Sequence, residues 1–292
     1  MTAVVDVGRV APGRHTILRR TLRSRTGVIG AALVGLVVLA ALASLLGVLP
    51  HDAVTQVPAQ RLRGPSGEHW FGTDQFGRDV FARAAGGAAS SLLVAVVAVA
   101  IATAVGTAAG VVAGFFGGWS SRVVLGVTNV LFAFPPLLLA LALASAFDRT
   151  WLTVAAAIAT VYTPIFVRVA RGPVLALREA EFVQAATVLG FSPLRTLARH
   201  VLPNIAPILI VQVTLSLSWA VLTEASLSFL GLGTPPPAPS LGAMVLEARV
   251  LVNVAWWSMA APGVVIVALV VGLNLLGDGL RDALDPRGGG NS

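Results

Sequence analysis

The sequence predicts an all-α membrane protein with six transmembrane helices. Of its 292 residues, 56% are hydrophobic and only 11% are charged, whereas soluble domains carry about 25% charged residues. The apolar residues form continuous runs rather than the alternating pattern of a transmembrane β-strand. The runs are long enough to cross a bilayer as helices, and backbone groups inside lipid must be hydrogen-bonded within the segment.

Six uncharged runs give the expected transmembrane segments. They are residues 27–49, 87–116, 123–147, 151–167, 205–223 and 254–277. The first run could alternatively be a secretory signal peptide, because Ala41, Leu42 and Ala43 resemble a cleavage site. The long preceding tail and the continuation of the apolar run to Leu49 favour a transmembrane helix instead.

The arginines set the expected orientation. All 20 basic residues are arginine, and placing the N-terminal tail in the cytoplasm puts 14 of them inside and 6 outside. Such an excess is typical of cytoplasmic loops, so both termini are expected on the cytoplasmic side of the inner membrane. The expected division is a cytoplasmic tail (1–26), a first transmembrane helix (27–49), an extracytoplasmic segment (50–86), a five-helix core (87–280) containing a cytoplasmic loop (172–203), and a cytoplasmic tail (281–292).

Missing residue types exclude several kinds of site. Cysteine is absent, which excludes disulfides and thiolate metal sites. Lysine is also absent, which excludes a Walker A phosphate loop, so any ATP must be bound by another chain. His15, His51, His69 and His200 stand far apart, and no pair has the spacing of metal ligands. We expect no catalytic residue, metal or cofactor in this chain, and the dispersed positive charge predicts no nucleic-acid partner.

A polar segment with its own helix signals interrupts the apolar chain between the fourth and fifth spans. Residues 179–189 fit one helix, which Gly190 would end. A second helix is expected to begin at Ser192 and Pro193 and to stop before Pro203. Two interpretations remain open: an amphipathic hairpin that lies on the lipid headgroups, or a projection that docks on a soluble partner.

This segment resembles the EAA loop of bacterial ABC importer permeases. The resemblance lies in the series Gln184-Ala185-Ala186, Gly190 and His200-Val201-Leu202-Pro203. The family's loop begins with glutamate where this chain has Gln184, and a hydrophobic position near its end is His200 here. Three further stretches resemble the C-type permeases of dipeptide and oligopeptide importers: residues 71–83, 227–245 and 274–287.

The resemblance implies a permease subunit that forms a peptide translocation path together with a homologous permease. It further implies one or two ATPase subunits, which would bind ATP and Mg, and an extracytoplasmic substrate-binding protein. The same family also handles nickel chelates or haem. A role as a simple membrane anchor is disfavoured, because six spans exceed what anchoring needs. The residues implied in ATPase coupling are Glu181, Gln184, Ala185, Ala186, Gly190, Phe191, Arg195, His200 and Pro203.

Two further sets of residues are candidates for function. A compact polar cluster lies in the extracytoplasmic segment, as either a folded cap over the pore or a contact for the binding protein: Gly72, Thr73, Asp74, Gly77, Arg78 and Asp79. Within it, Asp74 and Arg78 are expected to pair. Glu224 lies in an apolar run and is either a structural residue or part of the translocation path. A titrating Glu224 would favour an ion-coupled secondary transporter, which leaves the two-helix segment unexplained.

Overall fold

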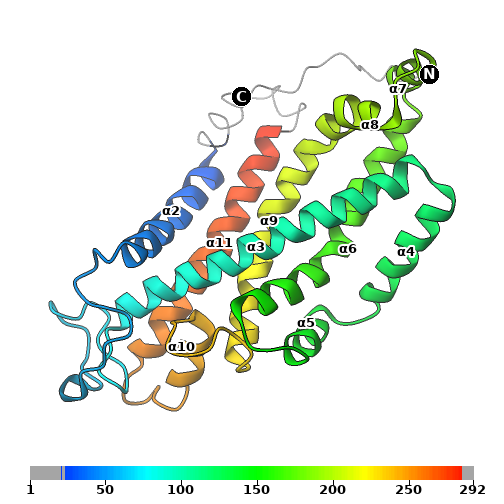
Figure 1. The fold of residues 1–292 in the computed structure, drawn as a ribbon. Helices are drawn as coiled ribbons and strands as arrows, with labels where there is room; N and C mark the ends of the chain where they lie inside the picture. Colours follow the sequence, from blue (N-terminus) through cyan, green and yellow to red (C-terminus); the bar gives the residue numbers. More distant parts are fainter. Residues whose placement is uncertain (1–20, 22–23, 285–292) are drawn as a thin grey trace.

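A bundle of long helices makes up most of the chain (Figure 1). The computed structural model describes residue 21 and residues 24–284, and in these ranges the predicted all-α class is confirmed. The long helices are α2 (Arg25–Leu45), α3 (Val80–Phe115), α6 (Trp151–Arg178), α9 (Leu202–Phe229) and α11 (Trp257–Leu284). The shorter elements are η1 (Pro58–Gln60), α4 (Gly118–Phe132), α5 (Pro136–Ser145), α7 (Glu181–Val188), α8 (Pro193–Thr196), η2 (Leu197–Val201) and α10 (Leu241–Ala248).

Five of these helices are long and apolar enough to cross a membrane, and the bent pair α4–α5 makes up to six. The short helices α7 and α8 lie at one end of the bundle and α10 lies toward the other, whereas α4 runs along one side (Figure 1). We call these two ends the α7/α8 end and the α10 end. Most of the expected N-terminal tail, and residues 285–292 of the expected C-terminal tail, lie outside the described residues.

The expected third span, residues 123–147, is wrong as a single helix. It is divided into α4 and α5, which meet at an angle of 92°. The break ends at Pro135, and Pro136 is the first residue of α5. Neither proline has an N–H to donate, and each disfavours a helical conformation in the residue before it.

Two helices extend well beyond the uncharged runs that predicted them. α3 begins at Val80 rather than residue 87, and α6 continues to Arg178 rather than ending at residue 167. The added turns contain arginines whose charges are accommodated by neighbouring groups. For example, the guanidinium of Arg168 lies 4.1 Å from the centroid of the Phe132 ring and donates to Asn129 Oδ1 at 3.1 Å. Ending each predicted span at its first charged residue therefore underestimates the length of these two helices.

The centre of the bundle is the contact between α3 and α6, where glycines bring the two backbones together. A Cβ on Gly106 would lie 2.6 Å from the Thr163 carbonyl oxygen, and one on Gly110 would lie 2.5 Å from the Val167 carbonyl oxygen. A Cβ on Gly114, one turn further, would also be crowded by α6. Small residues at this spacing let membrane helices approach closely, so that van der Waals packing holds them together.

A second cluster of buried side chains lies at the α7/α8 end. It contains Val111, Ala170, Val174, Leu197, Val201 and Ile205. These residues come from α3, α6, η2 and α9. The cluster therefore fixes the polar segment that follows α6 onto the central α3–α6 pair.

Replacement of Gly106 by leucine should destabilise the protein, because the added side chain has no room against α6. Overpacking of this kind costs about 1–3 kcal/mol or more. The matched control is Gly126→Leu, since a Cβ at Gly126 on α4 meets nothing within 4 Å. We expect the melting temperature of the purified protein in detergent to fall for Gly106→Leu only. Equal melting temperatures for the two variants would contradict the close α3–α6 contact.

Candidate functional site

The end of α7 has the geometry of a Schellman motif. Gly190 has φ = +77°, a conformation that favours glycine. Its N–H donates to the carbonyl of Thr187 at 3.0 Å, and the N–H of Phe191 donates to the carbonyl of Ala186 at 3.0 Å. Two carbonyls at the helix end are thus satisfied, and the chain turns sharply. The predicted helix end at Gly190 is confirmed.

The next helix begins as predicted but does not end as predicted. Ser192 caps α8 by accepting from the N–H of Arg195 at 3.4 Å, and Pro193 occupies the first turn. The expected stop before Pro203 is wrong, because α8 continues through η2 into α9 as one helix of 37 residues. η2 is a π-helical turn.

The π-helical turn explains how the helix continues into Pro203. In a regular α-helix the ring of Pro203 would clash with the carbonyl four residues earlier, that of Arg199, and would leave it unpaired. A wider turn immediately before the proline changes this pairing. Asn204 adds a side-chain donor there, because its Nδ2 donates to the carbonyl of His200 at 2.6 Å.

Aromatic contacts hold the elbow between α7 and α8. The ring of His200 lies 6.2 Å from that of Phe182 and 6.3 Å from that of Phe191, centroid to centroid. The guanidinium of Arg195 lies 4.4 Å from the centroid of Phe191. Phe191 is therefore a packing residue at the elbow, and the angle between the two helices is fixed by side chains as well as by Gly190.

The residues expected at an ATPase contact differ in their accessibility. The exposed ones are Glu181, Gln184, Ala185, Gly190, Arg195 and Pro203. Phe191 and His200 are half-buried, and Ala186 is 4% exposed. The side chain of Ala186 therefore packs inside this chain and does not itself present a surface to a partner.

The most exposed apolar side chains of the segment were not among those expected site residues. Val188 is 87% exposed, Leu189 is 74% exposed and Leu194 is 77% exposed. We call these three residues the apolar tip. They flank the elbow in sequence, and buried Val183 and the second core cluster hold the opposite face of the segment.

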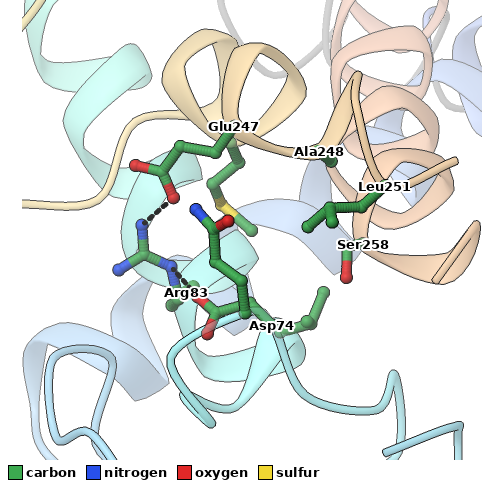
Figure 2. A pocket seen from close by; sticks show the side chains of 9 residues that line it. Asp74, Arg83, Glu247, Ala248, Leu251 and Ser258 are labelled. Carbon is green, nitrogen blue, oxygen red and sulfur yellow. Dashed lines mark ion pairs between the residues drawn. The ribbon is translucent and has the colours of Figure 1, made fainter. Parts of the chain in front are cut away.

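At the α10 end, four charged side chains form a network, which we call the cap network: Asp74, Arg78, Arg83 and Glu247. Arg78 Nε lies 2.6 Å from Asp74 Oδ2, and Arg78 Nη2 lies 2.8 Å from Glu247 Oε2. Arg83 pairs with the same two carboxylates at 3.5 and 3.6 Å (Figure 2). The network joins the loop before α3 to α3 and α10. The pairing of Asp74 with Arg78 was predicted, whereas Glu247 was missed because it lies 169 residues from Arg78.

The other residues of the predicted cluster shape the loop before α3, which we call the cap (residues 50–79). A Cβ on Gly77 would lie 1.9 Å from the Val57 carbonyl oxygen, and Gly77 has φ = +73°. The carbonyl of Thr73 accepts from Trp257 Nε1 at 3.1 Å, which attaches the segment to α11. Asp79 caps α3 by accepting from the N–H of Ala82 at 2.7 Å.

Burial favours the folded cap among the two interpretations of this cluster. All six of its residues, including Gly72, are buried. Their side chains and backbone therefore pack within the loop before α3 and present little surface of their own. Phe76, a neighbour of the cluster, is 41% exposed.

A small cavity of about 10 Å³ lies beside the cap network. Asp74, Arg83, Glu247 and Ser258 are among the residues that line it (Figure 2). The hydroxyl of Ser258 is buried without a hydrogen-bond partner among the described residues. A space of this size and polarity suits one water molecule.

Three residues of the cap could share a metal ion, which their spacing in the sequence did not indicate. His51, His69 and Asp79 each offer a ligand atom, and these atoms lie within 4.8 Å of one another. Hydrogen bonds already engage them: His69 Nδ1 donates to Asp79 Oδ2 at 2.8 Å, and His51 Nε2 lies 2.9 Å from the carbonyl oxygen of Glu68. In this arrangement the three side chains tie the cap to the start of α3.

Glu224 lies inside the bundle and is 1% exposed. Its carboxyl group accepts from Ser228 Oγ at 2.6 Å and Ser91 Oγ at 2.5 Å, and Ser240 Oγ lies 3.4 Å away. The group thus joins α9 to α3 and to the residue before α10. It is enclosed by hydroxyls of its own chain, which favours the structural role over a place on an open path.

Residues 106–288 match the family described as "Binding-protein-dependent transport system inner membrane component". The chain is 40% identical over 278 residues to the dipeptide transport system permease protein DppC of Alkalihalophilus pseudofirmus, covering 95% of this chain and 91% of that protein. It is 40% identical over 240 residues to the probable D,D-dipeptide transport system permease protein DdpC of Escherichia coli, covering 82% and 80%. It is 39% identical over 274 residues to the glutathione transport system permease protein GsiD of Escherichia coli, covering 94% and 90%.

The cap network makes a testable contribution to stability. Asp74→Asn preserves the shape of the side chain but removes the carboxylate from between two buried arginines. Breaking a buried ion pair by removing one partner costs about 3–5 kcal/mol. Asp52→Asn is the matched control, because Asp52 also accepts from backbone N–H groups but is exposed and forms a local turn. We expect a lower melting temperature for Asp74→Asn alone, and a similar small shift in both variants would contradict the role of the network.

Proposed function

The chain belongs to the family of binding-protein-dependent transport system inner membrane components, the permease subunits of ABC importers, and we propose that it carries short peptides. Members of this family are non-catalytic membrane subunits. Three relatives that cover most of the chain are named for dipeptides, D,D-dipeptides or glutathione. These names support a short peptide as substrate over a nickel chelate or haem.

The complex that we propose contains a homologous permease, one or two ATPase subunits and an extracytoplasmic binding protein. This chain has no lysine, so a Walker A loop that binds ATP must belong to other subunits. Its α4–α5 pair also presents apolar side chains outward, with Val127, Val130 and Leu138 each more than half exposed. Such a surface suits a second membrane subunit, with which the chain would enclose the translocation path.

The apolar tip carries the proposal that this chain couples to an ATPase. Val188, Leu189 and Leu194 are each at least 74% exposed. Other apolar side chains of this segment, by contrast, pack against the bundle. The Schellman turn and the His200 contacts hold the elbow beside them in one shape. A fixed apolar projection of this kind fits a groove on a folded protein. The α7/α8 end would then lie in the cytoplasm, and the cap would lie outside.

The continuous helix gives the tip a mechanical connection to the opposite end of the bundle. Pro193–Phe229 contains 37 residues, and at 1.5 Å per residue it is about 55 Å long. One end begins beside the elbow, and the other carries Glu224, which bonds to α3 and to Ser240 before α10. Movement of the tip with an ATPase would therefore displace the segments that lie below the cap, consistent with alternating access driven by closure of the ATPases.

The first test replaces one residue of the tip. Val188→Asp should leave the chain folded, because the side chain is 87% exposed. It should reduce ATP-driven peptide uptake by at least about tenfold, since an unpaired carboxylate in an apolar interface costs several kcal/mol. The control is Val188→Ile, which keeps the site apolar and should transport at the normal rate. The measurement is uptake into proteoliposomes that contain the partner subunits.

The second part of the test locates the tip. The chain has no cysteine, so Val188→Cys provides a unique thiol. Membrane-impermeant maleimide should label it only from the cytoplasmic side, and it should crosslink to the ATPase in the assembled complex. Labelling from outside would overturn the orientation. Normal uptake by Val188→Asp, together with no crosslink in any nucleotide state, would favour a hairpin that lies on the headgroups.

A further inference from the structure

Helices α2 and α11 are in close contact at the α7/α8 end. A Cβ on Gly30 would lie 2.5 Å from the backbone nitrogen of Leu276 and 2.7 Å from the carbonyl oxygen of Gly272. One on Gly279 would lie 2.7 Å from Gly27 Cα. Backbones that approach this closely leave no space between the two helices in this half of the bundle.

Toward the α10 end the same two helices separate (Figure 1). A cavity of about 680 Å³ opens between them, with α3 as its third wall. Small side chains widen it, among them Ala40 on α2, Ala84 and Ala88 on α3, and Ala261 on α11. The lining is almost entirely apolar. The cavity is therefore a wedge that narrows toward the middle of the bundle.

Aromatic side chains border the wide end of this wedge. The ring of Phe81 lies 5.0 Å from Trp70 and 5.2 Å from Phe71, centroid to centroid. Trp256 also lines the cavity and is 61% exposed. Tryptophans gather where a bilayer meets water, so this end of the cavity lies at the membrane surface.

The depth of the wedge matches one leaflet. Its lining follows α11 from Trp257 to Ala268, which at 1.5 Å per residue is about 16 Å. The hydrocarbon core of a bilayer is about 30 Å thick. A transmembrane helix of a partner would need a groove through the whole core, whereas this one closes near the middle, where Gly30 meets α11.

We propose that this wedge binds an acyl chain of a phospholipid from the extracytoplasmic leaflet. The acyl chain has the right length and needs no hydrogen bonds. A peptide substrate fits poorly, because the lining offers almost no polar group and an unpaired amide in such a place costs several kcal/mol. The proposal depends on the orientation given above only for the choice of leaflet. A bound lipid would fill the gap between α2 and the aromatic border of the cap.

The test uses the assembled transporter in vesicles containing phosphatidylethanolamine with a photoactivatable diazirine in its acyl chain. Two variants reduce the space from opposite walls, Ala261→Phe and Ala40→Phe. The control is Val267→Phe, which adds a similar ring on α11 at an exposed position that does not line the wedge. After illumination, mass spectrometry measures lipid attached to the peptides that line the cavity.

We expect labelling of these peptides in the unmodified protein and in Val267→Phe. It should fall about tenfold in both cavity variants, because close-packed interiors do not admit a chain and a ring in one space. Equal labelling in all variants would overturn the proposal. A crosslink from Ala261→Cys to the partner permease would overturn it too, since a protein segment would then occupy the wedge. Peptide uptake is measured separately, so its loss or survival does not decide this test.

Discussion

The close backbone contact between α3 and α6 is the constraint on which the rest of the structure depends. Gly106 and Gly110 remove the side chains that would separate the two helices. At one end of the pair, the second core cluster fixes η2 and so positions the polar segment. At the other end, α3 carries Arg83 into the cap network and Ser91 toward Glu224. Both candidate sites are therefore attached to one rigid unit.

Features that depend on nearby residues could be predicted from the sequence. Gly190 ends α7 and Ser192 begins α8, because helix ends are determined by a few adjacent backbone and side-chain groups. The long apolar runs located the membrane spans because a run of about 20 apolar residues is itself a local property of the sequence. The recurrence of glycine at every fourth position from 106 to 114 was also readable as a helix-packing signal, although it did not enter the predictions.

Features that depend on distant residues could not be predicted in this way. Arg83 lies within α3 because Glu247 and Asp74 neutralise its charge. His51 and His69 meet only after the cap has folded. One miss was local: Pro203 was expected to end a helix, yet the π-helical turn just before it carries the helix past it. That error has a functional consequence, since the uninterrupted helix connects the apolar tip with Glu224 and the region below the cap.

The central claim is that the apolar tip is the surface through which an ATPase acts on this permease. A cryo-electron microscopy structure of the assembled transporter, with nucleotide bound, tests it most directly. The account predicts that Val188, Leu189 and Leu194 are buried in a groove of an ATPase subunit, with Pro193–Phe229 still one continuous helix. A structure in which these three side chains lie in lipid headgroups or water, while the ATPases contact other parts of the chain, would contradict it.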